Sequence, residues 1–141
     1  MKIALINTLY PPHQVGGAER SVQILAEGLA AAGHEPVVLT LSEHRDGTVE
    51  IINGVRVYRV RLDNLYWPFR DDGDRPSVAY RALWHVLDIH NGSMARQVRE
   101  ILALERPHVV HTHNLAGFSV SVWSAAVRFG IPIVHTTRDY S

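Results

Sequence analysis

Apolar residues along the chain form two repeating patterns, one typical of buried strands and the other of amphipathic helices. Short continuous apolar runs predict parallel strands that are covered on both faces. These runs cover residues 2–7, 36–41, 108–113 and 131–137. Between the first two, an apolar stripe over 18–32 repeats about every 3.6 residues and predicts a helix, which Gly33 ends. Strands and helices that alternate in this way predict an α/β fold with a right-handed, doubly wound, mostly parallel sheet.

A tight hairpin is predicted around Asn53-Gly54, because both central residues of such a turn favour a positive φ. The dipeptide joins two short apolar segments, 49–52 and 55–58, and we expect them to form a small antiparallel insert in the parallel fold. The segment 62–76 that follows is rich in aromatic and acidic residues and is expected to be a loop.

Two further helices are expected in the second half of the chain. The first covers 77–106, with a break or kink at Asn91-Gly92, and Pro107 ends it. The second covers 118–129, between the last two predicted strands.

The composition narrows the classes of function. With 141 residues the chain has the size of one domain, and we expect residues 1–141 to form a single domain. Its 14 basic and 14 acidic side chains cancel, so neither nucleic acid nor an anionic membrane is indicated as a partner. The lack of cysteine excludes disulfides, thiolate metal ligands and cysteine nucleophiles. No signal segment and no run near the roughly 18 apolar residues of a membrane span is seen, so a cytoplasmic protein is expected.

The most informative segment joins the first predicted strand to the first predicted helix and contains the pair Gly16-Gly17. Glycines let a backbone approach a ligand closely, and a helix amino terminus adds about half a positive charge, so the segment suits a phosphate. A tight turn or close helix–strand packing is the alternative explanation of the glycines. A dinucleotide fold fits poorly, because the G-x-G-x-x-G spacing is absent. Glu19, in the first helical turn, favours the helix dipole and can orient the loop.

Histidines gather on two neighbouring predicted strands. His111 and His113 are two residues apart on one strand and therefore point to the same side, and His135 lies on the next strand. Converging imidazoles would suggest a zinc site. Hydrogen bonding of these histidines to nearby backbone is the favoured alternative, because no carboxylate lies among them at ligand spacing. We interpret His113, at the carboxyl end of its strand, as a polar site residue and not as a metal ligand.

The polar segment Arg138-Asp139-Tyr140 follows the last predicted strand. An arginine just past a buried strand and close to a glycine loop can hold a phosphate or sugar hydroxyls through two hydrogen bonds. A solvated surface charge is the ordinary alternative. Asp139 either accepts a hydrogen bond from a sugar hydroxyl or pairs with Arg138, and both interpretations stay open.

Three segments together resemble a known family. They are V-G-G-A-E-R at 15–20, P-H-V-V-H-T-H-N-L at 107–115 and I-P-I-V-H-T-T-R-D-Y at 131–140. In this order they are similar to the N-terminal domain of family-4 retaining glycosyltransferases of GT-B architecture. The resemblance spans the whole chain and implies a Rossmann-like fold. It also implies a cleft between two such domains, in which this domain receives the acceptor and a C-terminal domain binds the nucleotide-sugar donor.

The resemblance further implies roles for particular residues. Gly16 and Gly17 would approach the donor diphosphate, where backbone amides stabilise the charge that builds on the leaving group. Arg138 and Asp139 would take part in catalysis. Residues expected at the acceptor or the sugar are Glu19, His113, Asn114 and Tyr140. No metal and no cofactor is implied.

One position departs from the family pattern, because many members have histidine where this chain has Arg138. Arginine cannot act as a neutral base near pH 7, so either its hydrogen bonding replaces the histidine or the chemistry differs here. We expect the chain to be the acceptor-side half of a retaining, hexosyltransferase-type enzyme that is inactive in isolation. It would act on a sugar, lipid or small-molecule acceptor, and an unpaired sheet edge would favour self-association. The alternative is a stand-alone module that binds an anion or nucleotide without catalysis.

Overall fold

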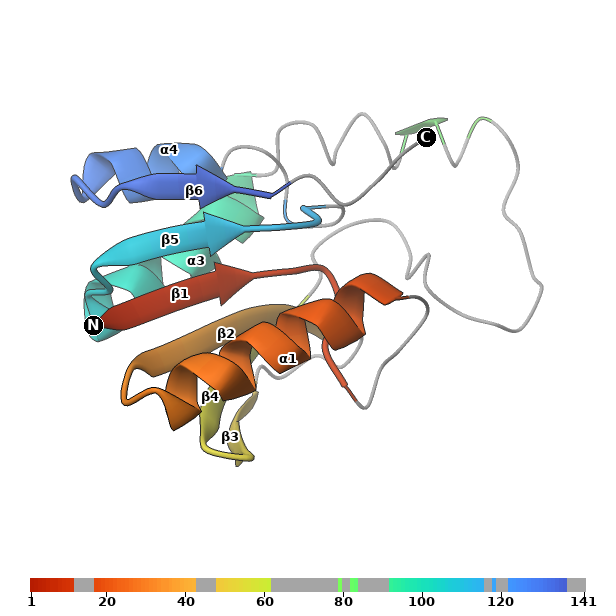
Figure 1. The fold of residues 1–141 in the computed structure, drawn as a ribbon. Helices are drawn as coiled ribbons and strands as arrows, with labels where there is room; N and C mark the ends of the chain where they lie inside the picture. Colours follow the sequence, from red (N-terminus) through yellow and green to blue (C-terminus); the bar gives the residue numbers. More distant parts are fainter. Residues whose placement is uncertain are drawn as a thin grey trace.

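The computed structural model describes residues 1–11, 17–42, 48–61, 79, 82–83, 92–115, 118 and 122–136. Within these residues a single sheet carries helices on both faces (Figure 1). The strands are β1 (Lys2–Ile6), β2 (Glu35–Ser42), β3 (Thr48–Ile52), β4 (Val55–Arg61), β5 (Val109–Thr112) and β6 (Ile133–His135). The helices are α1 (Gly17–Ala31), α3 (Gly92–Glu105) and α4 (Val122–Arg128).

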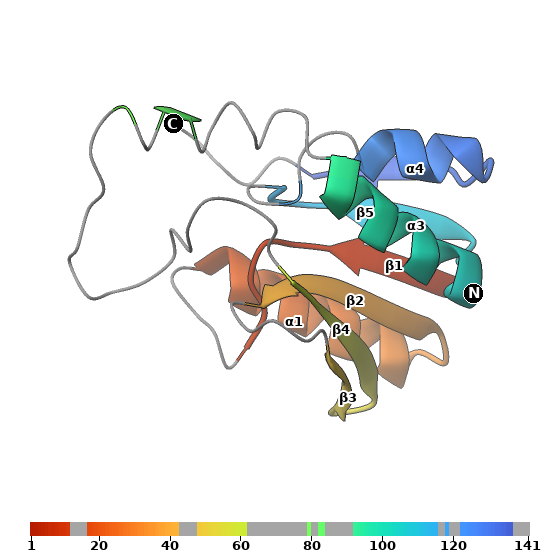
Figure 2. The same cartoon turned by 180° about the vertical axis from the view of Figure 1, so that it is seen from behind.

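The described sheet has the strand order β3-β4-β2-β1-β5-β6, and each neighbouring pair except β3–β4 is parallel. Helix α1 covers one face, whereas α3 and α4 cover the other, as the two opposite views show (Figures 1 and 2). The chain passes from β1 through α1 to β2 on one side, and from β5 through α4 to β6 on the other. The predicted doubly wound, mostly parallel α/β fold is therefore confirmed.

Two apolar clusters explain why the central strands read as continuous apolar runs. Successive residues of a strand point to opposite faces, so a strand covered on both faces needs apolar residues throughout. In β1, Ala4 and Ile6 belong to the cluster beneath α3 and α4, whereas Ile3 and Leu5 belong to the cluster beneath α1. Each of these four side chains is buried. Full burial of a side chain such as leucine contributes about 1.5–3 kcal/mol to the free energy of unfolding. The two clusters therefore hold α1, α3 and α4 firmly against the sheet.

The predicted hairpin is present, and its second strand is also part of the main sheet. Asn53 and Gly54 have φ values of 51° and 81°, as their turn requires. Strand β4 then pairs in parallel with β2, from Val37 opposite Arg56 to Ser42 opposite Arg61. Only β3 is an antiparallel addition. The local pattern identifies the turn, but not the parallel pairing with a strand that lies earlier in the chain.

The described helices agree with the predicted ones in place. Gly33 has a φ of 89° just after α1, and α3, at Gly92–Glu105, covers the second part of the helix predicted over 77–106. Most of the first part, including residues 84–91, lies outside the described residues, so the break at Asn91-Gly92 stays a prediction. Helix α4 covers Val122–Arg128, within the predicted range 118–129. Phe118 lies in a turn and donates its backbone N–H to the Leu115 carbonyl at 2.8 Å, and residues 119–121 lie outside the described residues. The expected loop over 62–76 lies outside the described residues.

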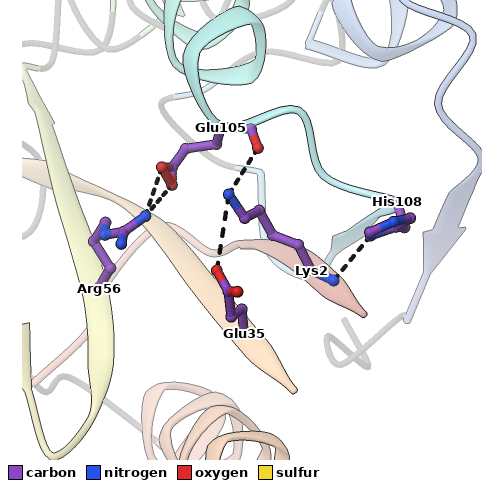
Figure 3. Close-up of polar contacts among 5 residues, drawn as sticks. All are labelled: Lys2, Glu35, Arg56, Glu105 and His108. Carbon is purple, nitrogen blue, oxygen red and sulfur yellow. Dashed lines mark hydrogen bonds and ion pairs between the residues drawn. The ribbon is translucent and has the colours of Figure 1, made fainter. Parts of the chain in front are cut away.

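A polar cluster joins the amino ends of the strands to the last residue of α3 (Figure 3). Both carboxylate oxygens of Glu105 accept from Nη1 of Arg56 at 2.6 Å, and this hydrogen bond is the main cause that raises the pKa of Arg56. Nζ of Lys2 donates to the Glu105 carbonyl at 2.9 Å and forms an ion pair with Oε2 of Glu35 at 3.8 Å. The backbone N–H of Lys2 donates to Nδ1 of His108 at 3.0 Å. These contacts hold the edge of the sheet opposite the carboxyl ends of the strands.

Candidate functional site

The carboxyl ends of β1 and β5 are the natural place for a site. The two strands are neighbours, and the chain that leaves β1 forms α1 on one face, whereas the chain that leaves β5 forms α4 on the other. At such a switch point the connections diverge and leave room for a ligand between them. Asn7 and Thr8 follow β1 here, and His113 and Asn114 follow β5.

Asn7 connects the ends of these two strands. Its side chain is fully buried; Nδ2 donates to the Leu9 carbonyl at 2.6 Å, and Oδ1 accepts from the Asn114 backbone N–H at 3.1 Å. The buried Thr8 completes the connection, because its backbone N–H and its hydroxyl donate to the Asn114 carbonyl at 2.9 and 3.0 Å. The backbone of Asn114 is thus fixed by the two residues that follow β1.

The end of β2 joins the same network. The Thr8 carbonyl accepts from the Leu41 backbone N–H and from the Thr40 hydroxyl, both at 3.1 Å, and the Asn7 N–H donates to the Leu39 carbonyl at 3.1 Å. The ends of three adjacent strands are therefore held by hydrogen bonds around Asn7 and Thr8. Asn7 and Thr8 are not among the predicted site residues, although polar residues at the end of an apolar run are a usable signal.

The segment from Leu9 to Pro11 leads from this network toward the glycine loop. Tyr10 is buried beneath α1 among residues that include Val22 and Ala26. Burial, with a smaller contribution from the negative charge of Glu27, raises the pKa of Tyr10 to about 12. One residue further, the Pro11 carbonyl accepts from Nη2 of Arg59 on β4 at 2.8 Å.

Gly17 is the first residue of α1 and brings a helix amino terminus to this edge of the sheet. A Cβ atom added at Gly17 would meet no atom of the described residues within 4 Å, so packing against that part of the chain does not explain the glycine. The amino terminus of a helix carries about half a positive charge and presents backbone N–H groups, which suits an anion. Glu19 lies in the first turn and is buried. Gly16 lies outside the described residues.

The histidines are divided between the two faces of the sheet. His111 and His113 have ring centroids 4.1 Å apart, and Nε2 of His111 lies 2.7 Å from the Thr136 hydroxyl. His135 is opposite Thr112 in the register, and Nδ1 of His135 lies 2.8 Å from the Thr112 hydroxyl, on the face toward α4. The three imidazoles therefore do not converge, and hydrogen bonding explains His111 and His135 better than a zinc site. Among the residues that the structure describes, no group of three side chains could hold a metal ion.

His113 and Asn114 are next to each other at the carboxyl end of β5 but differ in exposure. His113 is 2% exposed and lies beneath this edge of the sheet, whereas Asn114 is exposed. The described part of this edge ends at Thr136, whose backbone N–H donates to the Thr112 carbonyl at 2.9 Å. The predicted residues Arg138, Asp139 and Tyr140 lie outside the described residues.

Comparison with known proteins agrees with this arrangement. Residues 16–141 match the model of the glycosyl transferase 4-like domain. The chain is 39% identical to an uncharacterized 42.6 kDa protein in the cps region of Klebsiella pneumoniae, over 99% of the chain and 37% of that protein. It is 30% identical to glycogen synthase of Mycobacterium tuberculosis, over 96% of the chain and 33% of that enzyme. A shorter stretch, 43% of the chain and 15% of the relative, is 49% identical to an uncharacterized glycosyltransferase of Methanocaldococcus jannaschii.

Solved structures show the same fold. Sucrose-phosphate synthase from Thermosynechococcus elongatus superposes with a TM-score of 0.70 at 22% identity, covering 98% of this chain and 33% of that one. The catalytic domain of starch synthase IV from Arabidopsis thaliana gives a TM-score of 0.59 at 15% identity, over 98% of this chain and 34% of that one. The chain thus spans about a third of the length of the relatives that match nearly all of it. No helix in the described ranges is long and apolar enough to cross a membrane. The chain belongs to the glycosyl transferase 4-like domain family and has the Rossmann-like fold of a GT-B domain.

Proposed function

We propose that this chain is the acceptor-side half of a retaining glycosyltransferase, which moves a hexosyl group from a nucleotide-sugar donor to a sugar, lipid or small-molecule acceptor. One observation carries the proposal. The amino terminus of α1, at Gly17, belongs to the same edge of the sheet as the network of Asn7, Thr8 and Asn114, in a chain of the glycosyl transferase 4-like family.

Gly16 and Gly17 are proposed to face the diphosphate of the donor. As the bond between the sugar and the diphosphate breaks, negative charge builds on the leaving oxygen. Backbone N–H groups and the helix dipole of α1 stabilise this charge, and preorganised donors of this kind are often the largest single contribution to catalysis. The fixed segment before the loop limits the movement of these amides, so the stabilisation needs little reorganisation. No metal is required in this scheme.

The acceptor is proposed to bind between the loop and the end of β5. Asn114 is exposed there on a backbone that Asn7 and Thr8 hold, and the buried His113 forms the wall behind it. Glu19 and Tyr140 are proposed to complete the acceptor site. Arg138 would hold sugar or phosphate oxygens through two hydrogen bonds, and Asp139 would accept from a sugar hydroxyl. A retaining transfer then depends on positioning and leaving-group stabilisation.

A substitution in α1 tests the role of the loop. In the full-length enzyme we expect Gly17→Val to lower kcat/KM by a factor of about 100 or more, because a β-branched side chain blocks the approach of the diphosphate. Gly28→Val is the matched control, since a Cβ at Gly28 also meets no described atom within 4 Å and Gly28 lies in the same helix, about three turns from its amino terminus. Transfer is measured with UDP-, ADP- and GDP-sugars in turn. Equal activity of the two variants would refute the proposed role of Gly17.

The division of labour between two domains has its own test. Chain 1–141 alone, given the donor that supports turnover in the full-length enzyme, is expected to transfer no sugar, because the groups that bind the nucleotide are proposed to lie in the C-terminal domain. Measurable turnover by the isolated chain would show instead that it holds a complete active site.

A further inference from the structure

Arg59 lies on β4, in the hairpin, and reaches across to the segment that precedes the glycine loop. Its side chain is 12% exposed, and Nη2 donates to the Pro11 carbonyl at 2.8 Å. On its other side, Nε donates to a carboxylate oxygen of Glu50 on β3. Pro11 is the last described residue before Gly17, so this contact is the described attachment nearest to the loop on its amino-terminal side.

A second arginine on the same strand shows what is particular about Arg59. Arg56 pairs with Glu105 on the opposite face of the sheet, where the arginine side chain is 41% exposed and the glutamate 7%. The pair of Arg59 and Glu50 has the reverse arrangement, because the arginine side chain is only 12% exposed and the glutamate is 45% exposed. Arg56 therefore satisfies a buried carboxylate at the end of α3. In the second pair Arg59 is the less exposed partner, and it donates a hydrogen bond to a backbone carbonyl outside the sheet.

The low exposure of the Arg59 side chain explains why its hydrogen bond to the Pro11 carbonyl fixes the backbone. A guanidinium that is largely shielded from water needs acceptors for its N–H groups, and a charge-assisted hydrogen bond to a carbonyl is stronger than a neutral one. Glu50 balances the charge and fixes the direction in which the guanidinium points. The segment before the loop is then held at three places: Asn7 by the end of β5, Tyr10 beneath α1, and Pro11 by the hairpin.

We propose that Arg59 is a positioning residue for the glycine loop, and that Glu50 orients it. Arg59 holds the Pro11 carbonyl, so the backbone that leads from β1 toward Gly17 starts from a fixed point, which would limit the reorganisation needed when the donor diphosphate binds. The diphosphate part of this inference rests on the proposed function, whereas the mechanical part, fixation of the loop by the hairpin, does not depend on it. Arg59 is not proposed to touch the substrate.

The test compares Arg59→Met with Arg56→Met in the full-length enzyme, because both variants remove an arginine from β4 and break an ion pair. Hydrogen exchange is measured on peptides that cover residues 7–22. We expect Arg59→Met to speed exchange of the loop amides about tenfold or more. It should lower kcat/KM for the nucleotide sugar about 10- to 100-fold, because misplaced groups lose the advantage of orientation. Arg56→Met should lower Tm and leave loop exchange and kcat/KM unchanged.

Two further variants separate positioning from simple stability. Arg59→Lys keeps a cationic donor and should recover part of the loss, whereas Glu50→Gln should have a smaller effect in the same direction. The proposal is overturned if Arg59→Met lowers Tm without faster exchange in the loop, or if Arg56→Met changes the loop equally. If the wild-type enzyme transfers no sugar from any donor tried, the proposed function fails, and the exchange data still decide whether Arg59 holds the loop.

Discussion

The Asn7 network allows a quantitative prediction. Replacement of Asn7 by leucine keeps the approximate size of a fully buried side chain but removes its donor and its acceptor. The Leu9 carbonyl then loses a hydrogen bond of 2.6 Å and the Asn114 backbone N–H loses one of 3.1 Å. Loss of a hydrogen bond at a buried polar group costs about 1–3 kcal/mol, so the two losses together cost roughly 2–6 kcal/mol. Burial of the two methyl groups that replace the amide oxygen and nitrogen offsets about 1–2 kcal/mol of this cost.

The net expectation for Asn7→Leu is a loss of about 3 kcal/mol in the free energy of unfolding, or roughly 10 °C in Tm for a domain of this size. Urea unfolding of the chain, followed by circular dichroism, measures the change. Thr40→Val is the matched control, because it also removes a buried hydrogen bond at 3.1 Å but leaves the Thr8 carbonyl with the Leu41 N–H as donor. The control should lose only about 1 kcal/mol. Equal losses in the two variants would refute the reasoning that the Asn7 side chain holds two backbone groups, where Thr40 holds one.

Three more predictions concern stability and assembly. Arg56→Met should lower the free energy of unfolding by about 2 kcal/mol, between the values for exposed and buried pairs, because Glu105 is buried and Arg56 is partly exposed; thermal unfolding that matches wild type would contradict this. The pKa of Tyr10 is raised to about 12, so the contribution of its neutral form to the free energy of unfolding is intact below pH 10.0, the ordinary pKa of tyrosine. This contribution is lost as the pH rises from there through about 12. The Tm of Tyr10→Phe should therefore decrease less steeply with pH above about pH 10 than the Tm of wild type. If both decrease with the same slope in alkaline melts, Tyr10 is excluded as the cause. Strand β6 lies at the edge of the described sheet, and pairing through this edge should cause chain 1–141 to self-associate. Light scattering measures this, and a monomer at high concentration would count against it.

The features that the sequence predicted well are those that depend on local pattern. The apolar runs of β1 and β2, the stripe of α1 and the turn at Asn53-Gly54 each report contacts within a few residues or a requirement for burial on both faces. The family also followed from motifs that lie at strand ends and at the start of α1, and the match over residues 16–141 confirms it.

The features that the sequence did not predict depend on contacts between distant residues. The parallel pairing of β4 with β2 is not visible in a hairpin motif, and nothing local distinguishes Arg59, which holds a backbone carbonyl, from Arg56, which pairs with Glu105. The importance of Asn7 depends on a partner far along the chain. His113 was predicted as a site residue from its place at a strand end, and its near-complete burial adds that it lies beneath this edge of the sheet. The proposed roles of Gly16, Arg138, Asp139 and Tyr140 stay predictions.

The hydrogen bond between Asn7 and Asn114 has a consequence for how the protein is made. Its two residues are 107 positions apart, so the site is the product of one of the longest-range contacts in the chain. At the usual speed of synthesis, about 5–20 residues per second, β1 leaves the ribosome roughly 5–20 s before its partner β5 exists. During that time β1 can pair only with β2, and the polar residues after it have water in place of Asn114. The edge at the carboxyl ends of β1 and β5 is therefore completed late, after the α1 half of the sheet has had time to form.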